Sequence, residues 1–177
     1  MNIRKMTLRN ELKRMKACQE AVKWVGDRDL AAAWAECERA DWMLWYAAWK
    51  APRTLVVRAA CACARTALRF VPDGEDRPRL AIRAAKRWAN NPTEENRNAA
   101  DDAGADAWVA TGTAEAAAWA AWTASAPAGS ATAAAAGAAA EVAADATRDA
   151  DPKTMADIVR SIISVNDMVG AENLRAE

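Results

Sequence analysis

Apolar positions recur at helical spacing from the start of the chain. After Thr7, apolar side chains stand at residues 8, 12, 15, 18, 22 and 25, three or four residues apart. This spacing places them on one face of a helix, and Gly26 is a natural end for it. We therefore expect a first helix from about Thr7 to Val25, with Asp27 capping the next one.

Turn residues divide the following stretch into further helices. Asp41 is a typical cap, and Pro52 stands where proline is tolerated, in the first turn of a helix. The segment 71–76, VPDGED, has the composition of a loop, and Asn-Asn-Pro at 90–92 breaks the helix before it. Thr93 then caps another helix. We expect these helices over residues 28–40, 42–49, 52–70 and 77–89.

Alanine dominates the second half, with 27 Ala among the 53 residues 98–150. Because Ala is the strongest helix former, we expect helix here and not a disordered tail. Pro127–Ser130 divides the tract into two long helices, and the first would carry Trp108, Trp119 and Trp122 on one stripe. Asp151-Pro152 opens a last helix, whose apolar face consists of Met155, Ile158, Val159, Ile162 and Ile163.

These patterns predict an all-α protein. Nine Trp but one Phe and one Tyr occur, and no stretch has the alternation of a strand. We predict one domain over residues 1–177, a compact bundle of about seven to eight helices with Ala-lined packing. An irregular α-solenoid is the alternative, although no fixed repeat is visible. The domain would have a Trp- and Arg-rich half, 1–92, and an Ala-rich acidic half, 93–177.

Charge separates the two halves although the chain as a whole is neutral. Residues 1–97 hold 20 Lys+Arg and 12 Asp+Glu, a net +8, whereas residues 98–177 hold 4 and 12, a net −8. The halves either dock on each other or present separate fields to partners. The N-terminus lacks the apolar core of a signal peptide, and no window resembles a membrane span, so we expect a cytoplasmic protein without membrane contact.

The residues give no support for catalysis. Histidine, the commonest general acid–base, is absent, as are dinucleotide-binding, P-loop, zinc-protease and calcium-loop motifs. We expect no enzyme, no cofactor and no metal. Cys61 and Cys63 would project about 200° apart on a helix and could not clamp one ion. All four cysteines are expected to be thiols that act as small buried residues: Cys18, Cys37, Cys61 and Cys63.

Two acidic segments are candidate protein-binding sites. The first lies beside the tryptophan stripe Trp42, Trp45 and Trp49, at helical spacing. Core packing is the favoured interpretation of that stripe, and an exposed anchor for a partner is the alternative. The second is the predicted loop near residue 75. The candidate residues are Glu36, Glu38, Asp41 and Trp42 in the first segment, and Asp73, Glu75, Asp76 and Arg77 in the second.

Basic residues form an alternative site on the two helices around that loop. They recur on one face of each helix, which suits nucleic-acid phosphates, an acidic protein, the acidic half of this chain or simple solvation. Nucleic acid is disfavoured because the chain is neutral and carries no recognition motif. The residues of this alternative site are Arg58, Arg65 and Arg69 on the first helix, and Arg79, Arg83 and Lys86 on the second.

Several ordered segments resemble a known family. They are ACQEAVKW at 17–24, AW at 33–34 with CERADWMLW at 37–45, AACACAR at 59–65, VPDGEDRPR at 71–79, KRWA at 86–89 and ADIVR at 156–160. Together they resemble the immunity proteins of bacteria and phages that have a Trp-rich N-terminal half and an Ala-rich helical tail. The match is dense over residues 12–89 and rests on composition in the alanine tract.

The resemblance implies a non-enzymatic antagonist that neutralises a toxin or effector enzyme by direct binding, with no catalytic residues of its own. Three other functions remain open: a phage or mobile-element inhibitor of a defence system such as a CRISPR effector complex, a nucleic-acid-binding accessory protein, or an internal structural protein. Self-association into a homo-oligomer also remains open.

Overall fold

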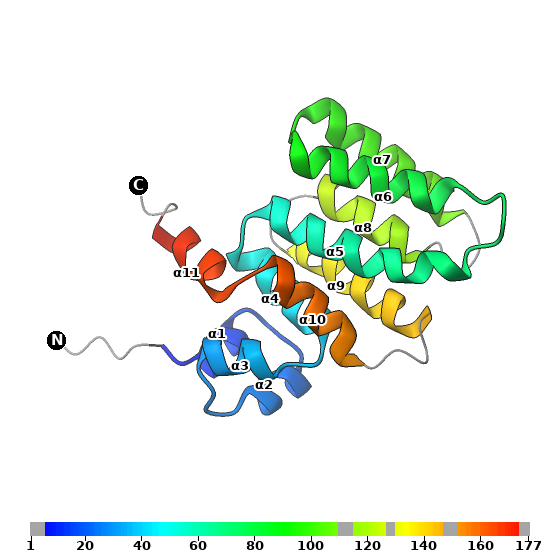
Figure 1. Cartoon of the computed structure of the whole chain (residues 1–177). Helices are drawn as coiled ribbons and strands as arrows, with labels where there is room; N and C mark the ends of the chain where they lie inside the picture. The colour runs from blue at the N-terminus through cyan, green and yellow to red at the C-terminus, as the bar shows by residue number, and fades with distance from the viewer. Residues whose placement is uncertain (1–5, 110–114, 127–129, 147–151, 174–177) are drawn as a thin grey trace. The chain divides into compact units, whose positions relative to one another are not determined.

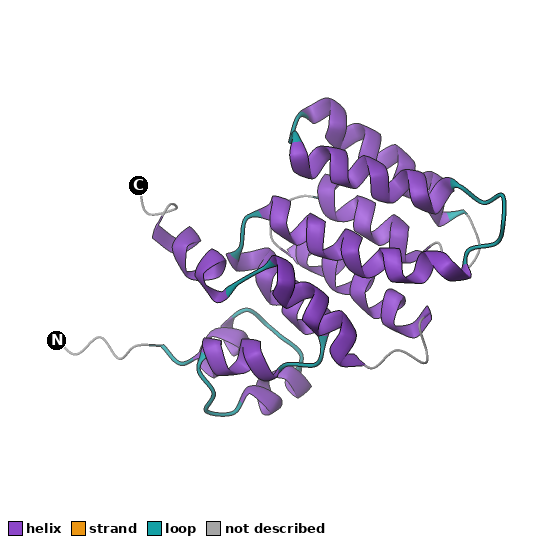
Figure 2. Cartoon of the chain, viewed as in Figure 1, coloured by secondary structure: helices purple, strands orange, loops and turns teal. Residues whose placement is uncertain are grey.

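The computed structural model describes residues 6–109, 115–126, 130–146 and 152–173. Within these ranges it has eleven α-helices and one short 3₁₀ helix, and no strand (Figure 2). The all-α prediction is confirmed. None of the described helices is long and apolar enough to cross a membrane.

The chain divides into two compact units. The N-terminal unit spans residues 1–37 and the C-terminal unit spans residues 38–177. This division does not follow the change of composition at residue 92, because helices from both sides of that position pack together in the C-terminal unit. The prediction of one domain over 1–177 stays a prediction.

The N-terminal unit contains three short helices: α1 (Leu8–Arg14), α2 (Gln19–Val25) and α3 (Leu30–Glu36). Thr7 caps α1, since its hydroxyl accepts a hydrogen bond from the Asn10 amide at 3.3 Å. The single helix expected over 7–25 is wrong. Lys16 adopts a left-handed φ of 60°, which closes α1 and turns the chain before α2 begins.

The ends of α2 and α3 show how local caps set helix length. Gly26, with φ 52°, ends α2 as expected. The cap of α3 is Asp29 and not Asp27: its carboxylate accepts a hydrogen bond from the Ala32 amide at 2.8 Å. Since the chain is already extended at Cys37, α3 is shorter than the predicted helix over 28–40.

The C-terminal unit begins with helices close to those expected. They are α4 (Ala40–Lys50), α5 (Arg53–Ala67), the 3₁₀ helix η1 (Leu68–Phe70), α6 (Arg77–Asn90) and α7 (Glu94–Trp108). Pro52 directly precedes α5, and Thr93 caps α7 by accepting from the Asn96 amide at 3.2 Å. Asp41 lies inside α4 and does not cap it.

The alanine tract is helical where it is described. The second of its two predicted helices is present, but the first is divided into two helices. The tract contains the end of α7, then α8 (Glu115–Ser125) and α9 (Ser130–Ala146). Because α7 and α8 pack side by side, they are not one continuous helix. Trp108, Trp119 and Trp122 therefore share no single stripe. Instead they meet across the two helices, with ring centroids 5.1–5.6 Å apart.

Two helices end the described chain: α10 (Pro152–Ile162) and α11 (Val165–Asn173). The apolar face predicted for one last helix is divided between fully buried and half-buried positions. Met155, Val159 and Ile163 are buried, whereas Ile158 and Ile162 are half-buried. Helix α10 packs on α4 and α5, and α11 packs on α4. The predicted opening residue, Asp151, lies outside the described residues.

Helices α5, α8 and α9 form the centre of the C-terminal unit (Figure 1). Helix α4 packs on α9. Helix α6 packs on α5, α7 and α8. These contacts join parts of the chain that are far apart in sequence. A solenoid repeat contacts only its neighbours, so the unit is a bundle.

Small residues line the interior helix contacts, as predicted. They let helix backbones approach closely. A Cβ atom placed on Gly137 of α9 would lie 3.3 Å from the backbone oxygen of Asp41 on α4. The fully buried alanines include Ala59, Ala60 and Ala67 on α5, Ala116, Ala120 and Ala124 on α8, and Ala136, Ala139 and Ala143 on α9.

The side chain of one arginine joins α5 to the end of α8 at the centre of this bundle. Arg53, at the start of α5, donates hydrogen bonds to the carbonyl oxygens of Thr123 at 3.2 Å, Ala124 at 2.9 Å and Ala126. Its guanidinium also stacks on the Trp88 ring at 5.2 Å. The last carbonyls of α8 have no partner within their own helix, and Arg53 provides one.

Candidate functional site: a basic groove between α5 and α6

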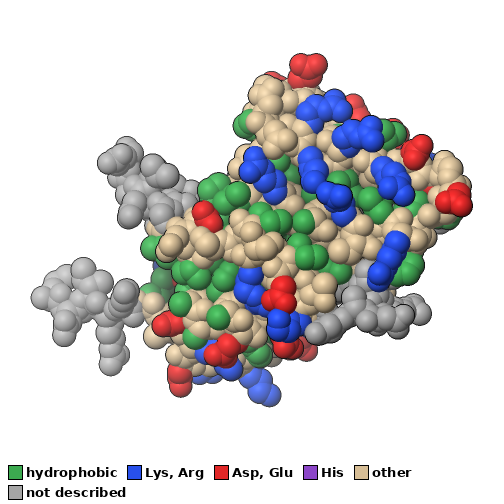
Figure 3. Space-filling view, viewed as in Figure 1, with side chains coloured by type: hydrophobic (Ala, Val, Ile, Leu, Met, Phe, Trp, Pro, Cys, Tyr) green, Lys and Arg blue, Asp and Glu red, His purple; other side chains and the backbone are tan. Residues whose placement is uncertain are grey.

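Helices α5 and α6 each have an alanine face and an arginine face. The short connection over residues 68–76 makes the two helices antiparallel neighbours. Their alanines face the interior, so their long cationic side chains project outward. Figure 3 shows the result as a band of Lys and Arg over this face, with acidic side chains at its edges.

A shallow hollow of about 320 Å³ lies in this band. It is open to solvent. Four cationic and two aliphatic side chains line it, and we call it the basic groove: Arg65, Leu68, Arg79, Ile82, Arg83 and Lys86. The sequence-predicted basic stripes thus meet here, since Arg65 comes from one helix and Arg79, Arg83 and Lys86 come from the other.

The groove concentrates positive charge without neutralising it. Among the described residues, none of its four cations forms an ion pair with a carboxylate. Lys86 is half-buried and the three arginines are exposed. The positive charge of the groove also acts on the buried Cys61 thiol. Burial raises the pKa of this thiol to about 12, and the charges of Lys86 and Arg65 oppose that rise.

Two aliphatic side chains form the floor of the groove, and sequence reasoning missed both as site residues. Ile82 is only 4% exposed and Leu68 is half-buried. Each stands three residues after a groove arginine, Arg79 and Arg65 respectively. A residue three positions after an arginine lies on the same side of a helix as that arginine. This spacing is the sequence signal from which Leu68 and Ile82 could have been predicted as site residues.

Two residues of the predicted basic site do not line the groove. Arg58 instead donates to the Asn90 side chain at 3.1 Å and to the Ala89 carbonyl at 3.4 Å, which ties α5 to the end of α6. Arg69 follows the end of α5 in the 3₁₀ helix, and its guanidinium lies over the Phe70 ring at 4.8 Å.

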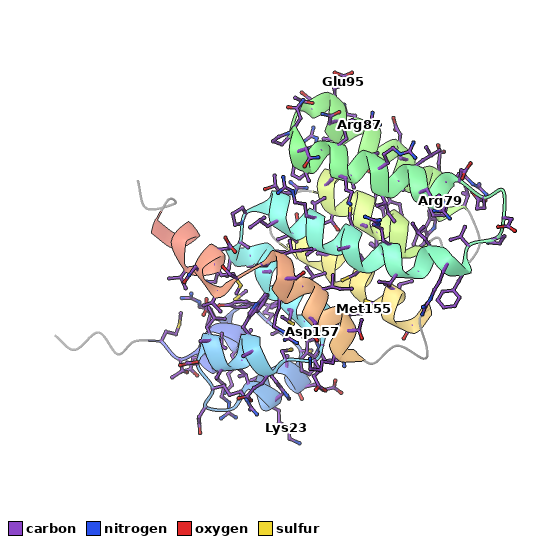
Figure 4. All side chains as sticks on the ribbon, in the orientation of Figure 1. Lys23, Arg79, Arg87, Glu95, Met155 and Asp157 are labelled. Atoms are coloured by element: carbon purple, nitrogen blue, oxygen red, sulfur yellow. The ribbon has the colours of Figure 1, made fainter. Side chains whose placement is uncertain are left out.

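Arg87 lies on the same helix as three groove cations but not in the groove. Figure 4 labels Arg79 near the start of α6 and Arg87 near its end, where both side chains lie at the surface. Arg87 is exposed, as Arg83 is, and stands one helical turn beyond it. It is therefore a matched control for any test of the groove.

The first acidic candidate site is not one described surface. Glu36 belongs to the N-terminal unit, where its carboxylate pairs with Arg28 at 2.7 Å, whereas Glu38, Asp41 and Trp42 belong to the C-terminal unit. Asp41 pairs with Arg39 at 2.6 Å, and the Arg39 guanidinium lies over the Trp42 ring at 4.7 Å. Two of the three carboxylates thus already have cationic partners.

The tryptophan stripe on α4 is neither the core face nor a bare anchor. Trp42, Trp45 and Trp49 are each half-buried. The fully buried side of α4 carries Leu44 and Ala47, at 0% exposure. Core packing, the favoured interpretation of the stripe, therefore holds only in part.

The second acidic candidate is built around a local ion pair. The Arg77 guanidinium donates to Glu75 Oε1 at 2.7 Å, and the Arg77 amide donates to the same oxygen at 3.1 Å. These hydrogen bonds lower the pKa of Glu75 to about 2. Asp73 and Asp76 are exposed.

The cysteines are mostly buried, as expected. Cys37, Cys61 and Cys63 are buried, whereas Cys18 is exposed, which contradicts the prediction for that residue. Burial raises the pKa of Cys63 to about 12 as well. In the described part of the chain, no group of three or more Cys, Asp or Glu side chains is placed to hold a metal ion.

Comparison with protein-family models, with curated proteins and with solved structures gave no match. The arrangement itself must therefore indicate the function. Four cations that have no carboxylate partner among the described residues surround an aliphatic floor. They can bind an anionic surface that also carries apolar groups.

Proposed function

We propose that the protein acts by binding, without catalysis, and that its basic groove binds an acidic surface on a protein partner. The observation that supports this proposal is that the four groove cations pair with no carboxylate in the part of the chain that the structure describes. A cluster of positive charges stabilises the complex with an anionic partner and raises the rate at which the two associate. The acidic segments that we predicted as binding sites, around Asp41 and Glu75, become secondary contacts in this proposal.

A protein partner fits the groove better than nucleic acid does. The chain has no net charge, since 24 Lys and Arg balance 24 Asp and Glu, so distant phosphates would feel little attraction. The floor of Leu68 and Ile82 gains nothing from a phosphate backbone. An acidic protein face carries aliphatic side chains between its carboxylates and meets both parts of the groove.

We further propose that binding antagonises the partner, in the cytoplasm. The resemblance to immunity proteins of bacteria and phages supports this role and makes a toxin or effector enzyme the expected target. A counter-defence inhibitor of a defence complex is the second candidate, since the same family occurs in phages. Both act by covering a surface of the target, and they differ in the target alone.

The test pairs capture with inhibition. The wild type, Arg83→Glu and Arg87→Glu would each be used to capture proteins from host extract. A true partner should be held by the wild type and Arg87→Glu and lost by Arg83→Glu. The purified partner should then lose its activity when one equivalent of the wild type is added.

Two outcomes would contradict the proposal. One is a partner that Arg83→Glu captures as well as the wild type does, since the groove would then not be its binding site. The other is a purified partner that keeps full activity at saturation, which would make the protein a binder but no antagonist.

A further inference from the structure

We infer that the basic groove recognises an acidic helix in which one aliphatic side chain stands between two carboxylates. This inference rests on the proposed function, because it names the partner surface that the groove would bind. It follows from the spacing of the cations, the position of the aliphatic floor and the size of the hollow.

The cations of α6 set the spacing of the partner's carboxylates. Arg79, Arg83 and Lys86 stand at i, i+4 and i+7, so they follow one face of the helix over about 10 Å. A partner helix lying along α6 repeats the same rise. Two of its acidic side chains, seven residues apart, would therefore meet Arg79 and Lys86 together.

The floor sets what stands between those carboxylates. Ile82 lies between Arg79 and Lys86 in the sequence of α6, and Leu68 reaches the hollow from the 3₁₀ helix η1. A residue three or four positions after the first partner carboxylate would point at this floor. An aliphatic side chain there removes apolar surface from water on both partners, whereas a polar one would lose its hydration without a hydrogen-bonding partner.

The hollow is large enough to admit an aliphatic side chain. Its volume of about 320 Å³ is at the lower end of the range for ligand sites, roughly 300–1,000 Å³. Arg65 of α5 lines the hollow together with Arg83 of α6, so it would contact the partner helix from the α5 side. Such a site suits one inserted side chain flanked by charges, which is the anchor of a helix-in-groove interface.

An exposed leucine continues the apolar surface beyond the cations. Leu80 is 49% exposed although it lies on α6 among charged residues. On a helical wheel it falls about 60° beyond Arg83, on the side away from Ile82. The row of cations thus runs between two apolar borders, a pattern that matches an amphipathic acidic helix and not a uniform polyanion.

The test uses the full-length protein and a synthetic helical peptide as the probe. The peptide carries two glutamates seven residues apart, with one leucine three residues after the first. A control peptide has glutamine in place of the leucine, and a single-stranded oligonucleotide serves as a polyanion. Binding would be measured by fluorescence anisotropy at low and at physiological salt.

The leucine peptide should bind roughly tenfold more tightly than the glutamine peptide, which corresponds to burial of one aliphatic side chain. Arg83→Glu should weaken binding of the leucine peptide at least tenfold, and Arg87→Glu should change it less than about twofold. Circular dichroism of both variants would verify that the fold is kept.

The contrary outcomes separate this inference from the proposed function. Equal binding of the two peptides, still lost in Arg83→Glu, would overturn the aliphatic anchor and leave an acidic partner standing. Tight binding of the oligonucleotide alone would overturn both, in favour of nucleic acid. Binding of every probe unaffected by Arg83→Glu would show that the groove is no binding site.

Discussion

The inner and outer faces of α5 and α6 use opposite kinds of residue. The inner faces carry alanines such as Ala60 and Ala85, both 0% exposed, on two helices that pack against α8. The outer faces carry arginine and lysine around the basic groove. Small side chains inside fix the distance between helices, and long side chains outside leave it unaffected. One pair of helices can therefore specify the fold and present a charged site independently.

This comparison predicts its largest effect for an enlarged side chain on the inner face. Ala60 of α5 is 0% exposed, so a leucine there must push the neighbouring helices apart. Ala60→Leu should lower the free energy of unfolding by about 3 kcal/mol. Urea denaturation would measure the change. The control is Ala105→Leu on the exposed side of α7, which should change stability by less than about 0.5 kcal/mol. Equal effects at the two positions would refute Ala-lined packing.

Removal of the arginine that fastens α8 should have the next largest effect. Arg53→Met keeps most of the side-chain volume but leaves the carbonyls of Thr123 and Ala124 without their donor. We expect a loss of about 2 kcal/mol, the usual range for hydrogen bonds to a charged group. Burial lowers the pKa of Arg53, and the charge of Arg97 lowers it further. The charged guanidinium is therefore less stable in this site than in water, which offsets part of the gain from its hydrogen bonds. Thermal denaturation would measure the loss, and an unchanged melting temperature would show that the cap contributes nothing.

A smaller effect is expected where α9 approaches α4. Glycine to alanine inside a helix ordinarily stabilises it by about 1 kcal/mol. At Gly137 the new Cβ would lie 3.3 Å from the backbone oxygen of Asp41, which cannot rotate away. We therefore expect Gly137→Ala to bring no gain and to destabilise by about 1 kcal/mol. Chemical denaturation would show the sign of the change in the free energy of unfolding. A clear gain in stability would mean that α4 and α9 can move apart easily.

The smallest effect on stability should come from the outer face itself. Arg83 is exposed and pairs with no carboxylate among the described residues. Arg83→Gln relieves repulsion within the groove, so the free energy of unfolding should rise slightly, by no more than about 0.5 kcal/mol. The gain should shrink at high salt, which screens exposed charges. A marked loss of stability would show that the outer face also holds the fold together.

The helices could be predicted from the sequence more completely than the contacts between them. Local signals gave the start of the first helix near Thr7, the Thr93 cap, the end of α2 at Gly26 and the loop at 71–76. The left-handed Lys16 escaped prediction because no glycine or asparagine marks it. Trp108 was assigned to the same stripe as Trp119 because periodicity cannot tell a continuous helix from two that fold back.

The same limit applies to the candidate site. The spacing of Arg79, Arg83 and Lys86 revealed a basic face from the sequence alone. It could not show that Arg65 faces them while Arg58 is held by Asn90, since that depends on how α5 and α6 align. The floor residue Ile82 looked like ordinary core for the same reason. Periodicity defines faces of single helices, and the groove exists only between two.

The bond from Arg53 to the end of α8 can form only late in the synthesis of the chain. Its donor and its first acceptor, Thr123, are 70 residues apart in the chain. A ribosome adding about 5–20 residues per second needs on the order of ten seconds to bridge that interval. Throughout it, the alanine face of α5 is complete but its partners α8 and α9 do not yet exist. The nascent chain must therefore carry an unassembled centre until most of the protein has been made.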